Sequence, residues 1–398
     1  MLNEDHVVAS ELADKKKGCL VHIPHRKLLT ASLALITAVA LSGCTNSDNT
    51  DNTTSTAPVT SAASGTTNSD GTCTLPADFK AGIAMREIVN DVNRDIVAGA
   101  TETFEAAGAT VTVTDAGGDA LKQNDNIESL INSGVNGLLP VLGDQQQVSP
   151  LTKKAADSGI YVASALFGVA PEGALTDVGY DDPLASSLMT RALFSSIGYK
   201  GDVYVFWVPG APILETRKSV MEAIAADYPQ ITLHEVPTEH GAAKSLSQMT
   251  DILTANPDEG TIAGVWGAYD LLVSGANEAI KRAGRDEIKV ASIDGDQVAF
   301  QMLFGENSPF VATVVGDVKA IGRLAAEAII QASCGDTASI PVATYTPLWV
   351  ATRNNGIEAG EMRWGEGLWE AAGLDKGAIE DMYTQDQPVL VSMPTLPK

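Results

Sequence analysis

Hydrophobic and polar positions follow two different periods between Thr110 and Pro140, and together they predict a strand, a helix and a second strand. Valines first alternate with threonines, and Asp115-Ala-Gly-Gly-Asp119 then breaks this pattern with turn and helix-capping residues. Gly134 ends the helix, and Val135 to Pro140 is an apolar run typical of a buried parallel strand. This order of elements predicts a βαβ unit. The apolar residues at helical spacing are Leu121, Ile127, Leu130 and Ile131.

Apolar runs and helical patterns keep alternating along the rest of the chain to about Asn355, which predicts an α/β fold with parallel sheets. Pro209 to Arg217 is predicted to be a loop, and Asp270 is predicted to cap the helix that follows it. The other predicted strands are Lys80–Arg86, Ile160–Leu166, Asp202–Val208, Thr261–Trp266 and Lys289–Ile293. The other predicted helices are Asp95–Ala107, Val148–Ser158, Pro183–Ser196, Ala242–Ala255, Leu271–Ala283 and Val318–Ser333.

The beginning of the chain has the pattern of an export signal. Basic residues precede an apolar run from Leu28 to Leu41, which is too short to span a bilayer. The run closes on Leu41-Ser42-Gly43-Cys44, which resembles a bacterial lipobox, so we predict a signal peptide at 1–43 and lipidation of Cys44. The alternative is a buried cysteine at the end of an uncleaved helix. Residues 44–77 are predicted to be a flexible tether, because small and polar residues dominate up to Gly71.

Composition and charge narrow the function further. The 398 residues are 44% hydrophobic, which is enough for one large or two ordinary domains. A net charge of −24 argues against a nucleic-acid partner and suits a soluble domain outside the cytoplasm. The predicted lipid on Cys44 would anchor this domain to the cell membrane. Once the signal is removed and Cys44 is lipidated, Cys73 and Cys334 remain. In an oxidising compartment these two can form a disulfide; the alternative is two free thiols.

The βαβ unit also resembles part of a known family, the ribose-binding proteins and their relatives. The matching residues are Asp115, Asp119, Lys122, Gln123, Ile127, Glu128, Leu130, Ile131, Gly134 and Val135. These proteins are type I periplasmic solute receptors, and the resemblance extends from about Phe79 to Asn355.

The resemblance implies two Rossmann-like lobes that are joined by three crossing strands and enclose a ligand cleft. The implied crossings are Val178–Asp182, Ala312–Asp317 and Thr344–Thr352. The implied division is lobe 1 at 78–181 and 317–345, and lobe 2 at 182–316 and 346–398. The last segment includes a C-terminal extension, from Gly356 onward, which is expected to pack along lobe 2.

Candidate ligand-binding residues follow from the same resemblance, at the carboxyl ends of strands where open α/β sheets bind ligands. They are Arg86, Asn90, Asn93, Trp207, His240, Tyr269 and Asp294. Asp294 begins Asp294-Gly295-Asp296, which resembles the family's Phe-Asp-Gly turn, and its carboxylate can accept two hydrogen bonds. All of these candidates except Tyr269 have a structural alternative: a helix cap for the asparagines and Asp294, a surface ion pair for Arg86, core packing for Trp207, and a surface turn for His240.

Several positions that bind sugars in the family have changed in this chain. Leu166-Phe167 stands where relatives have an Asp-Arg pair, Tyr269 replaces an asparagine, and Gly316 replaces a glutamine. Because polar groups have been lost, the expected ligand has a ring or an apolar face and few hydroxyls. A deoxy sugar, a polyol-like compound or a non-carbohydrate ring would fit.

No motif for catalysis is found in the sequence. GxSxG, a GxGxxG that opens a helix after a strand, a P-loop, CxxC and HExxH are all missing, and His234 and His240 lack zinc-protease spacing. We therefore predict that the protein is not an enzyme and has no cofactor or metal. The resemblance further implies a monomer that binds a small molecule for an ABC importer and contacts its membrane permease. The alternatives are a sensory binding protein that feeds a histidine kinase and an anchored hydrolase.

Overall fold

The computed structural model describes residues 65–67, 73–383 and 390–391. The chain divides into two units, Met1–Ala57 and Pro58–Lys398, and all described residues belong to the second. The predicted signal peptide, Cys44 and residues 44–64 of the predicted tether lie outside the described residues.

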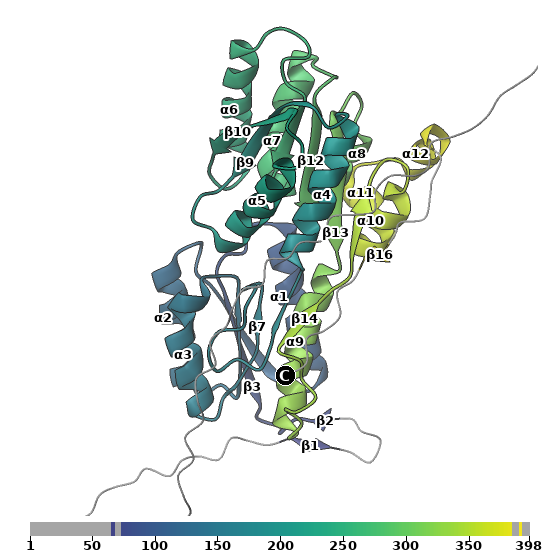
Figure 1. Cartoon of the computed structure of the whole chain (residues 1–398). Helices are drawn as coiled ribbons and strands as arrows, with labels where there is room; N and C mark the ends of the chain where they lie inside the picture. Colours follow the sequence, from purple (N-terminus) through teal and green to yellow (C-terminus); the bar gives the residue numbers. More distant parts are fainter. Residues whose placement is uncertain (1–64, 68–72, 384–389, 392–398) are drawn as a thin grey trace, which may run out of the picture. The chain divides into compact units, whose positions relative to one another are not determined.

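One parallel sheet has the strand order β14-β8-β7-β5-β3-β4, with β6 paired to β5. We call this sheet and the helices that pack on it lobe 1 (Figure 1). Its strands are β3 (Lys80–Met85), β4 (Thr110–Asp115), β5 (Gly137–Val141), β6 (Tyr161–Val162), β7 (Ser164–Ala165), β8 (Asp177–Gly179) and β14 (Ala343–Tyr345). Its helices are α1 (Asp91–Ala106), α2 (Ala120–Asn132), α3 (Gln145–Asp157) and α9 (Val318–Ser333).

The second sheet, the core of lobe 2, has the order β10-β9-β11-β12-β13-β15-β16. It is parallel except for β15 and β16, which pair antiparallel. Its strands are β9 (Gly201–Trp207), β10 (Ile231–Pro237), β11 (Gly264–Gly267), β12 (Lys289–Asp294), β13 (Phe310–Gly316), β15 (Leu348–Ala351) and β16 (Leu390–Val391). Its helices are α4 (Asp182–Ser196), α5 (Pro212–Ala225), α6 (Ala242–Ala255), α7 (Asp270–Ala283), α8 (Gln297–Phe304), α10 (Gly356–Trp364), α11 (Leu368–Ala372) and α12 (Lys376–Met382).

The chain passes between the two lobes three times. It leaves lobe 1 between β8 and α4, returns between β13 and α9, and leaves again between β14 and β15. The predicted α/β fold of two lobes joined by three crossings is therefore confirmed. The C-terminal extension forms α10 to α12, and α10 and α11 contact α8 of lobe 2 (Figure 1).

The βαβ unit forms as its pattern predicts, with one exception on the helix. Asp119 caps α2, because its side chain accepts hydrogen bonds from the backbone N–H groups of Leu121 and Lys122. Leu121, expected on the buried face, is 73% exposed at this first turn. The buried place is taken by Gln123, whose amide donates to the carbonyl oxygens of Ala84, Val141 and Leu142 and so satisfies the carboxyl ends of β3 and β5.

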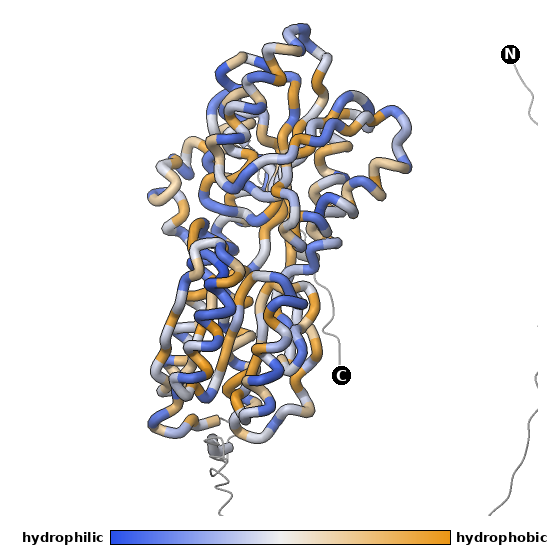
Figure 2. The backbone as a smooth tube through the Cα atoms, turned by 90° about the vertical axis from the view of Figure 1, so that its left-hand side faces the viewer, coloured by the Kyte–Doolittle hydropathy of each residue, from blue (hydrophilic) through white to orange (hydrophobic). Residues whose placement is uncertain are grey.

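Apolar side chains from both sheets and their helices form the core, while hydrophilic segments follow the outer turns of the helices (Figure 2). Within the described residues, no helix combines the length and the apolarity that crossing a bilayer requires. The largest fully buried side chain is Trp266, whose indole N–H donates to the Thr190 hydroxyl.

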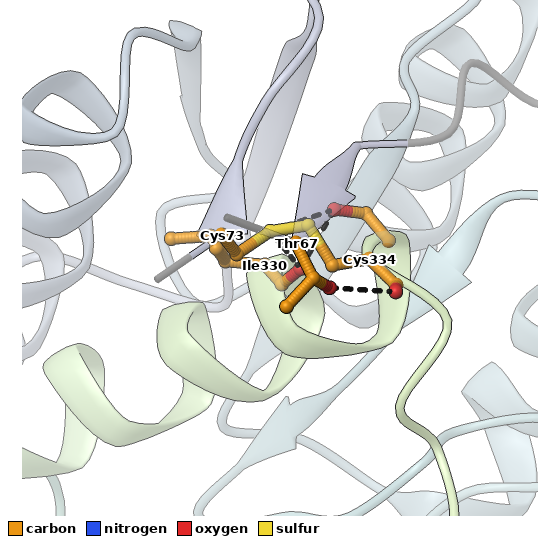
Figure 3. The surroundings of a disulfide bond; sticks show 5 residues. Thr67, Cys73, Ile330 and Cys334 are labelled. Carbon is orange, nitrogen blue, oxygen red and sulfur yellow. Dashed lines mark hydrogen bonds between the residues drawn. A yellow bond between two sulfur atoms is a disulfide. The ribbon is translucent and has the colours of Figure 1, made fainter. Parts of the chain in front are cut away.

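Cys73 and Cys334 form a disulfide at the end of α9 (Figure 3). Two short antiparallel strands, β1 (Thr66–Thr67) and β2 (Cys73–Thr74), lie beside it. The Thr67 hydroxyl donates to the Cys334 carbonyl, and the Gly65 N–H donates to the Ser333 carbonyl. Residues 65–67 and 73–77 therefore differ from the predicted flexible tether. The disulfide and these hydrogen bonds hold them against α9, which their composition alone does not predict.

We expect removal of the disulfide, by the double change Cys73→Ser and Cys334→Ser, to lower the free energy of unfolding by about 2–5 kcal/mol. The bond closes a loop with a sequence separation of 261 residues, and cross-links across long loops restrict the unfolded chain most. Guanidinium denaturation measures the change. A reducing agent should shift the unmodified chain toward the variant and leave the variant itself unchanged; equal stability of the two chains would contradict the prediction.

Candidate functional site

A pocket of about 330 Å³ lies between residues of both lobes, at the carboxyl ends of their parallel strands. This volume suits a small molecule. Lobe 1 contributes polar and apolar side chains: the polar ones are Arg86, Glu87, Asn93, Asp144 and Gln147, and the apolar ones are Val92, Leu142 and Leu166. Lobe 2 contributes Arg217, His240, Tyr269, Asp294 and the continuous segment Val208–Leu214. That segment contains no polar side chain, so it forms a continuous apolar part of the pocket beside the charged and hydrogen-bonding side chains.

Five of the seven predicted binding residues line this pocket: Arg86, Asn93, His240, Tyr269 and Asp294. Asn90 does not; it is the N-cap of α1 and accepts a hydrogen bond from the Asn93 N–H, the structural alternative for this residue. Trp207 is packed away from the pocket, with its indole N–H donating to Glu215 and the Lys218 ammonium 4.7 Å from its ring centre. Arg86 makes no ion pair with any residue that the structure describes.

Arg217 is a buried cation in the wall of the pocket, and the sequence interpretation missed it. The sequence predicts a loop up to Arg217, but α5 begins at Pro212, and the helix directs this side chain between two carboxylates. Its Nε donates to Asp182 Oδ1 at 2.7 Å and its Nη2 lies 3.0 Å from Asp294 Oδ1. Its Nη1 donates to the Ala268 carbonyl at 2.8 Å. With only 4% of the side chain exposed, Arg217 fixes the orientation of Asp294 and partly neutralises it.

Asp294 itself is held in an unusual backbone conformation at the end of β12, with φ of 116°. It does not cap α8, whose N-cap is Asp296. Burial raises the pKa of the Asp294 carboxyl to about 6, although the charge of Arg217 acts in the opposite direction. A carboxylate in this position is a strong hydrogen-bond acceptor for a ligand that enters the pocket.

Asp270 supports the neighbouring strands rather than capping α7, which corrects the prediction. Its carboxylate accepts hydrogen bonds from the hydroxyls of Ser292 and Thr313 and from the Asp296 N–H, and it is fully buried. The N-cap of α7 is Tyr269, without a side-chain bond. Burial and the charge of Asp294 raise the pKa of Asp270 to about 7.

These raised pKa values predict that the ligand-free protein loses stability as the pH rises. Asp177 and Asp294 have folded-state pKa values of about 6 and Asp270 of about 7, above the ordinary 3.8. Protonation therefore stabilises the folded state: the contribution is complete below pH 3.8 and is lost by about pH 7. We expect the free energy of unfolding to fall by about 3 kcal/mol or more across this interval, because each pKa unit corresponds to about 1.4 kcal/mol.

Denaturation at a series of pH values measures this loss. Asp270→Asn, which imitates the protonated form, should make the fall shallower, whereas Asp227→Asn at an exposed position should leave it unchanged. A profile that rises from pH 4 to pH 7 would contradict the prediction.

Two tyrosines complete the wall of the pocket. The Tyr269 hydroxyl lies 3.0 Å from His240 Nδ1 and accepts a hydrogen bond from the Gly241 N–H. Tyr180, 3% exposed, lies against Gly316, where a Cβ atom would be only 2.2 Å from its ring. The ring of Tyr180 thus fills the space that any side chain at position 316 would need. Among the described residues no group of three or more acidic, histidine or cysteine side chains could hold a metal ion.

Comparisons with known proteins agree with this architecture. A family model described as a periplasmic binding protein domain matches residues 82–337. The ribose import binding protein of Bacillus subtilis (strain 168) is 27% identical over 253 residues, which are 63% of this chain and 80% of that protein.

Among solved structures, a solute-binding protein of an ABC transporter from Agrobacterium vitis, with bound allitol, has a TM-score of 0.65 and 23% identity. The similarity covers 75% of this chain and 99% of that one. A 5-methylthioribose transporter solute-binding protein from Thermotoga lettingae, in complex with 5-methylthioribose, has a TM-score of 0.64 and 24% identity, over 75% of this chain and 98% of that one.

Proposed function

Because the chain belongs to the periplasmic binding protein family, we propose that it captures a sugar-like small molecule between its two lobes for an ABC importer. Membership of a family of binding domains agrees with the prediction that the chain is not an enzyme. The observation that carries the proposal is the pocket, in which the buried Arg217–Asp294 pair and the lobe 1 residues Arg86 and Asn93 converge on one cavity.

The chemistry of the two pocket walls defines the class of ligand. Charged and amide groups offer donors and acceptors to hydroxyls, as at Arg86, Asn93 and Asp294. The side chains of Val208–Leu214 offer apolar contact, and the Tyr269 ring adds to it. We therefore propose a pentose-sized ligand with hydroxyls on one side and an apolar substituent or face on the other. This ligand class agrees with the expectation, drawn from Leu166 and Gly316, of a ligand with an apolar face and few hydroxyls.

A thermal-shift screen tests the proposal with three probes named by relatives: D-ribose, allitol and 5-methylthioribose. A ligand that binds only the folded state raises the melting temperature by mass action. We expect the largest rise with 5-methylthioribose, whose methylthio group suits the apolar segment. Replacing Ile213, in that segment, by Asp should remove the preference for 5-methylthioribose over D-ribose. No shift with any of the three would contradict a sugar-like ligand.

We also propose that the protein is anchored to the membrane through a lipid on Cys44. The lipobox-like sequence before this residue supports the proposal. In cells labelled with a radioactive fatty acid, the unmodified chain should carry label and sediment with membranes. Cys44→Ser should carry none, and label on that variant would contradict the assignment of the site.

A further inference from the structure

The C-terminal extension packs directly behind the part of lobe 2 that bears the pocket carboxylate. The family match ends at residue 337, whereas α10 to α12 span 356–382. Ile357, Leu368 and Trp369 of the extension are buried in the core shared with α8, and the Gln301 amide of α8 donates to the Ala372 carbonyl. Because α8 begins just after Asp294-Gly295-Asp296, the extension is fixed against the helix that follows this turn.

Trp364, the last residue of α10, holds the turn itself. Its indole N–H donates to the Gly295 carbonyl at 2.9 Å. Gly295 has a positive φ of 67°, and a Cβ atom there would lie 2.6 Å from Val315 Cγ1, so the turn is enclosed by β13 on one side and by Trp364 on another. The backbone that carries Asp294 is therefore anchored by a residue outside the matched family domain.

Arg363 joins the same turn to the other lobe. Its Nη2 lies 2.5 Å from Asp95 Oδ2 on α1, and its guanidinium lies 4.0 Å from the centre of the Trp364 ring. Only 2% of the Arg363 side chain is exposed. A second contact between the lobes runs beside it, since the Gln297 N–H at the start of α8 donates to Asp91 Oδ2 on α1. The extension thus bridges lobe 1 and the pocket turn of lobe 2.

We propose that Arg363 and Trp364 are positioning residues: they fix the Asp294 turn against α1 and supply the positive charge behind it. Trp364 holds the backbone of the turn through its hydrogen bond to Gly295. The positive charge of Arg363 partly neutralises the carboxylates of Asp294 and Asp296. The ligand-binding role of Asp294 rests on the function proposed above. The positioning of its turn by Arg363 and Trp364 does not depend on that function.

Charged groups of several elements surround Asp294 and Asp296. They are Arg217 of α5, Asp182 of α4, Asp270 of α7, Arg363 of α10 and, beside Asp296, Asp91 of α1, with the hydroxyls of Tyr180 and Tyr269 nearby. Burial raises the pKa values of Asp294 and Asp296, and Arg363 lowers both. Loss of Arg363 should therefore move the titration of the turn to higher pH.

Four variants of the intact chain test the proposal without any ligand. Arg363→Met removes the charge, Arg363→Lys retains it, and Trp364→Phe removes the bond to Gly295 while keeping an aromatic ring under Arg363. Lys376→Met is the matched control, because Lys376 pairs with Glu361 and Glu380 inside the extension and, among the described residues, makes no ion pair with lobe 1 or the turn. The readouts are amide hydrogen exchange of residues 91–97 and 293–298 and the melting temperature between pH 5 and pH 8.

Arg363→Met should speed exchange about 10-fold or more in both segments and should lower the melting temperature more at pH 8 than at pH 5. Arg363→Lys should restore most of the pH profile. Trp364→Phe should speed exchange only at 293–298, and Lys376→Met should change neither segment. Equal destabilisation at both pH values, or unchanged exchange at 293–298 in Arg363→Met, would overturn the proposal. A failed ligand screen would leave these readouts intact, so the two proposals can fail separately.

Discussion

Replacing Arg217 by methionine is expected to lower the free energy of unfolding at pH 8 by about 3–5 kcal/mol, because it leaves two buried carboxylates without their cation. The side chains of Asp182 and Asp294 are 7% and 8% exposed, so water cannot replace the lost charge. At pH 5 the cost should be smaller, because both carboxylates have raised pKa values and can take up a proton. Chemical denaturation at the two pH values measures both effects.

The matched control for this variant is Arg282→Met. Arg282 also pairs with a carboxylate, that of Glu278, but the two side chains are 66% and 45% exposed. Exposed pairs contribute about 0–1 kcal/mol, so this variant should stay close to the unmodified chain. If Arg217→Met lost no more stability than Arg282→Met, the buried ion pair would not support the fold.

Replacing Asp294 by asparagine is expected to cause a large loss of ligand affinity with little loss of stability. Hydrogen bonds to a charged group contribute about 1.5–3 kcal/mol each, so we expect the affinity for a ligand found in the screen to fall at least about 100-fold. Stability at pH 8 should be unchanged or higher, because asparagine is not ionised and Arg217 keeps Asp182 as a partner. Isothermal titration calorimetry and denaturation of the same samples separate the two effects.

Asp227→Asn serves as the control for charge alone, since Asp227 is exposed at the end of α5. It should bind as the unmodified chain does. An Asp294→Asn variant that bound with unchanged affinity would show that the ligand lies elsewhere.

Local patterns in the sequence predict the elements of this fold and much of the pocket. Asp119 follows a strand and precedes a helical pattern, and it caps α2 as expected. Arg86, Asn93 and Asp294 are candidates through the family resemblance. They lie at or beyond the carboxyl ends of predicted parallel strands, which meet at one edge of a sheet, and the structure brings them to one cavity.

Residues whose partners come from distant segments could not be found this way. Arg217 lies in a helix that begins earlier than its Pro and Gly residues suggest, and its carboxylate partners belong to α4 and the end of β12. Asp270 has the local signature of a helix cap, yet the hydroxyls of β12 and β13 compete for its carboxylate. Trp207 ends a strand near the pocket, but Glu215 and Lys218 on α5 hold its ring away.

The disulfide at the end of lobe 1 has a mechanical consequence. Figure 1 places β1 and β2 at the end of lobe 1 away from the second sheet, and the bond joins Cys73 to Cys334 at the end of α9. A force that pulls on the chain from its N-terminal side is therefore transmitted to α9 through a covalent bond. Without the disulfide, the same force would act first on β3 and pull it out of the sheet. Because α9 packs on α1 over the most extensive contact between helices of lobe 1, the covalent link passes such a pull to the body of lobe 1.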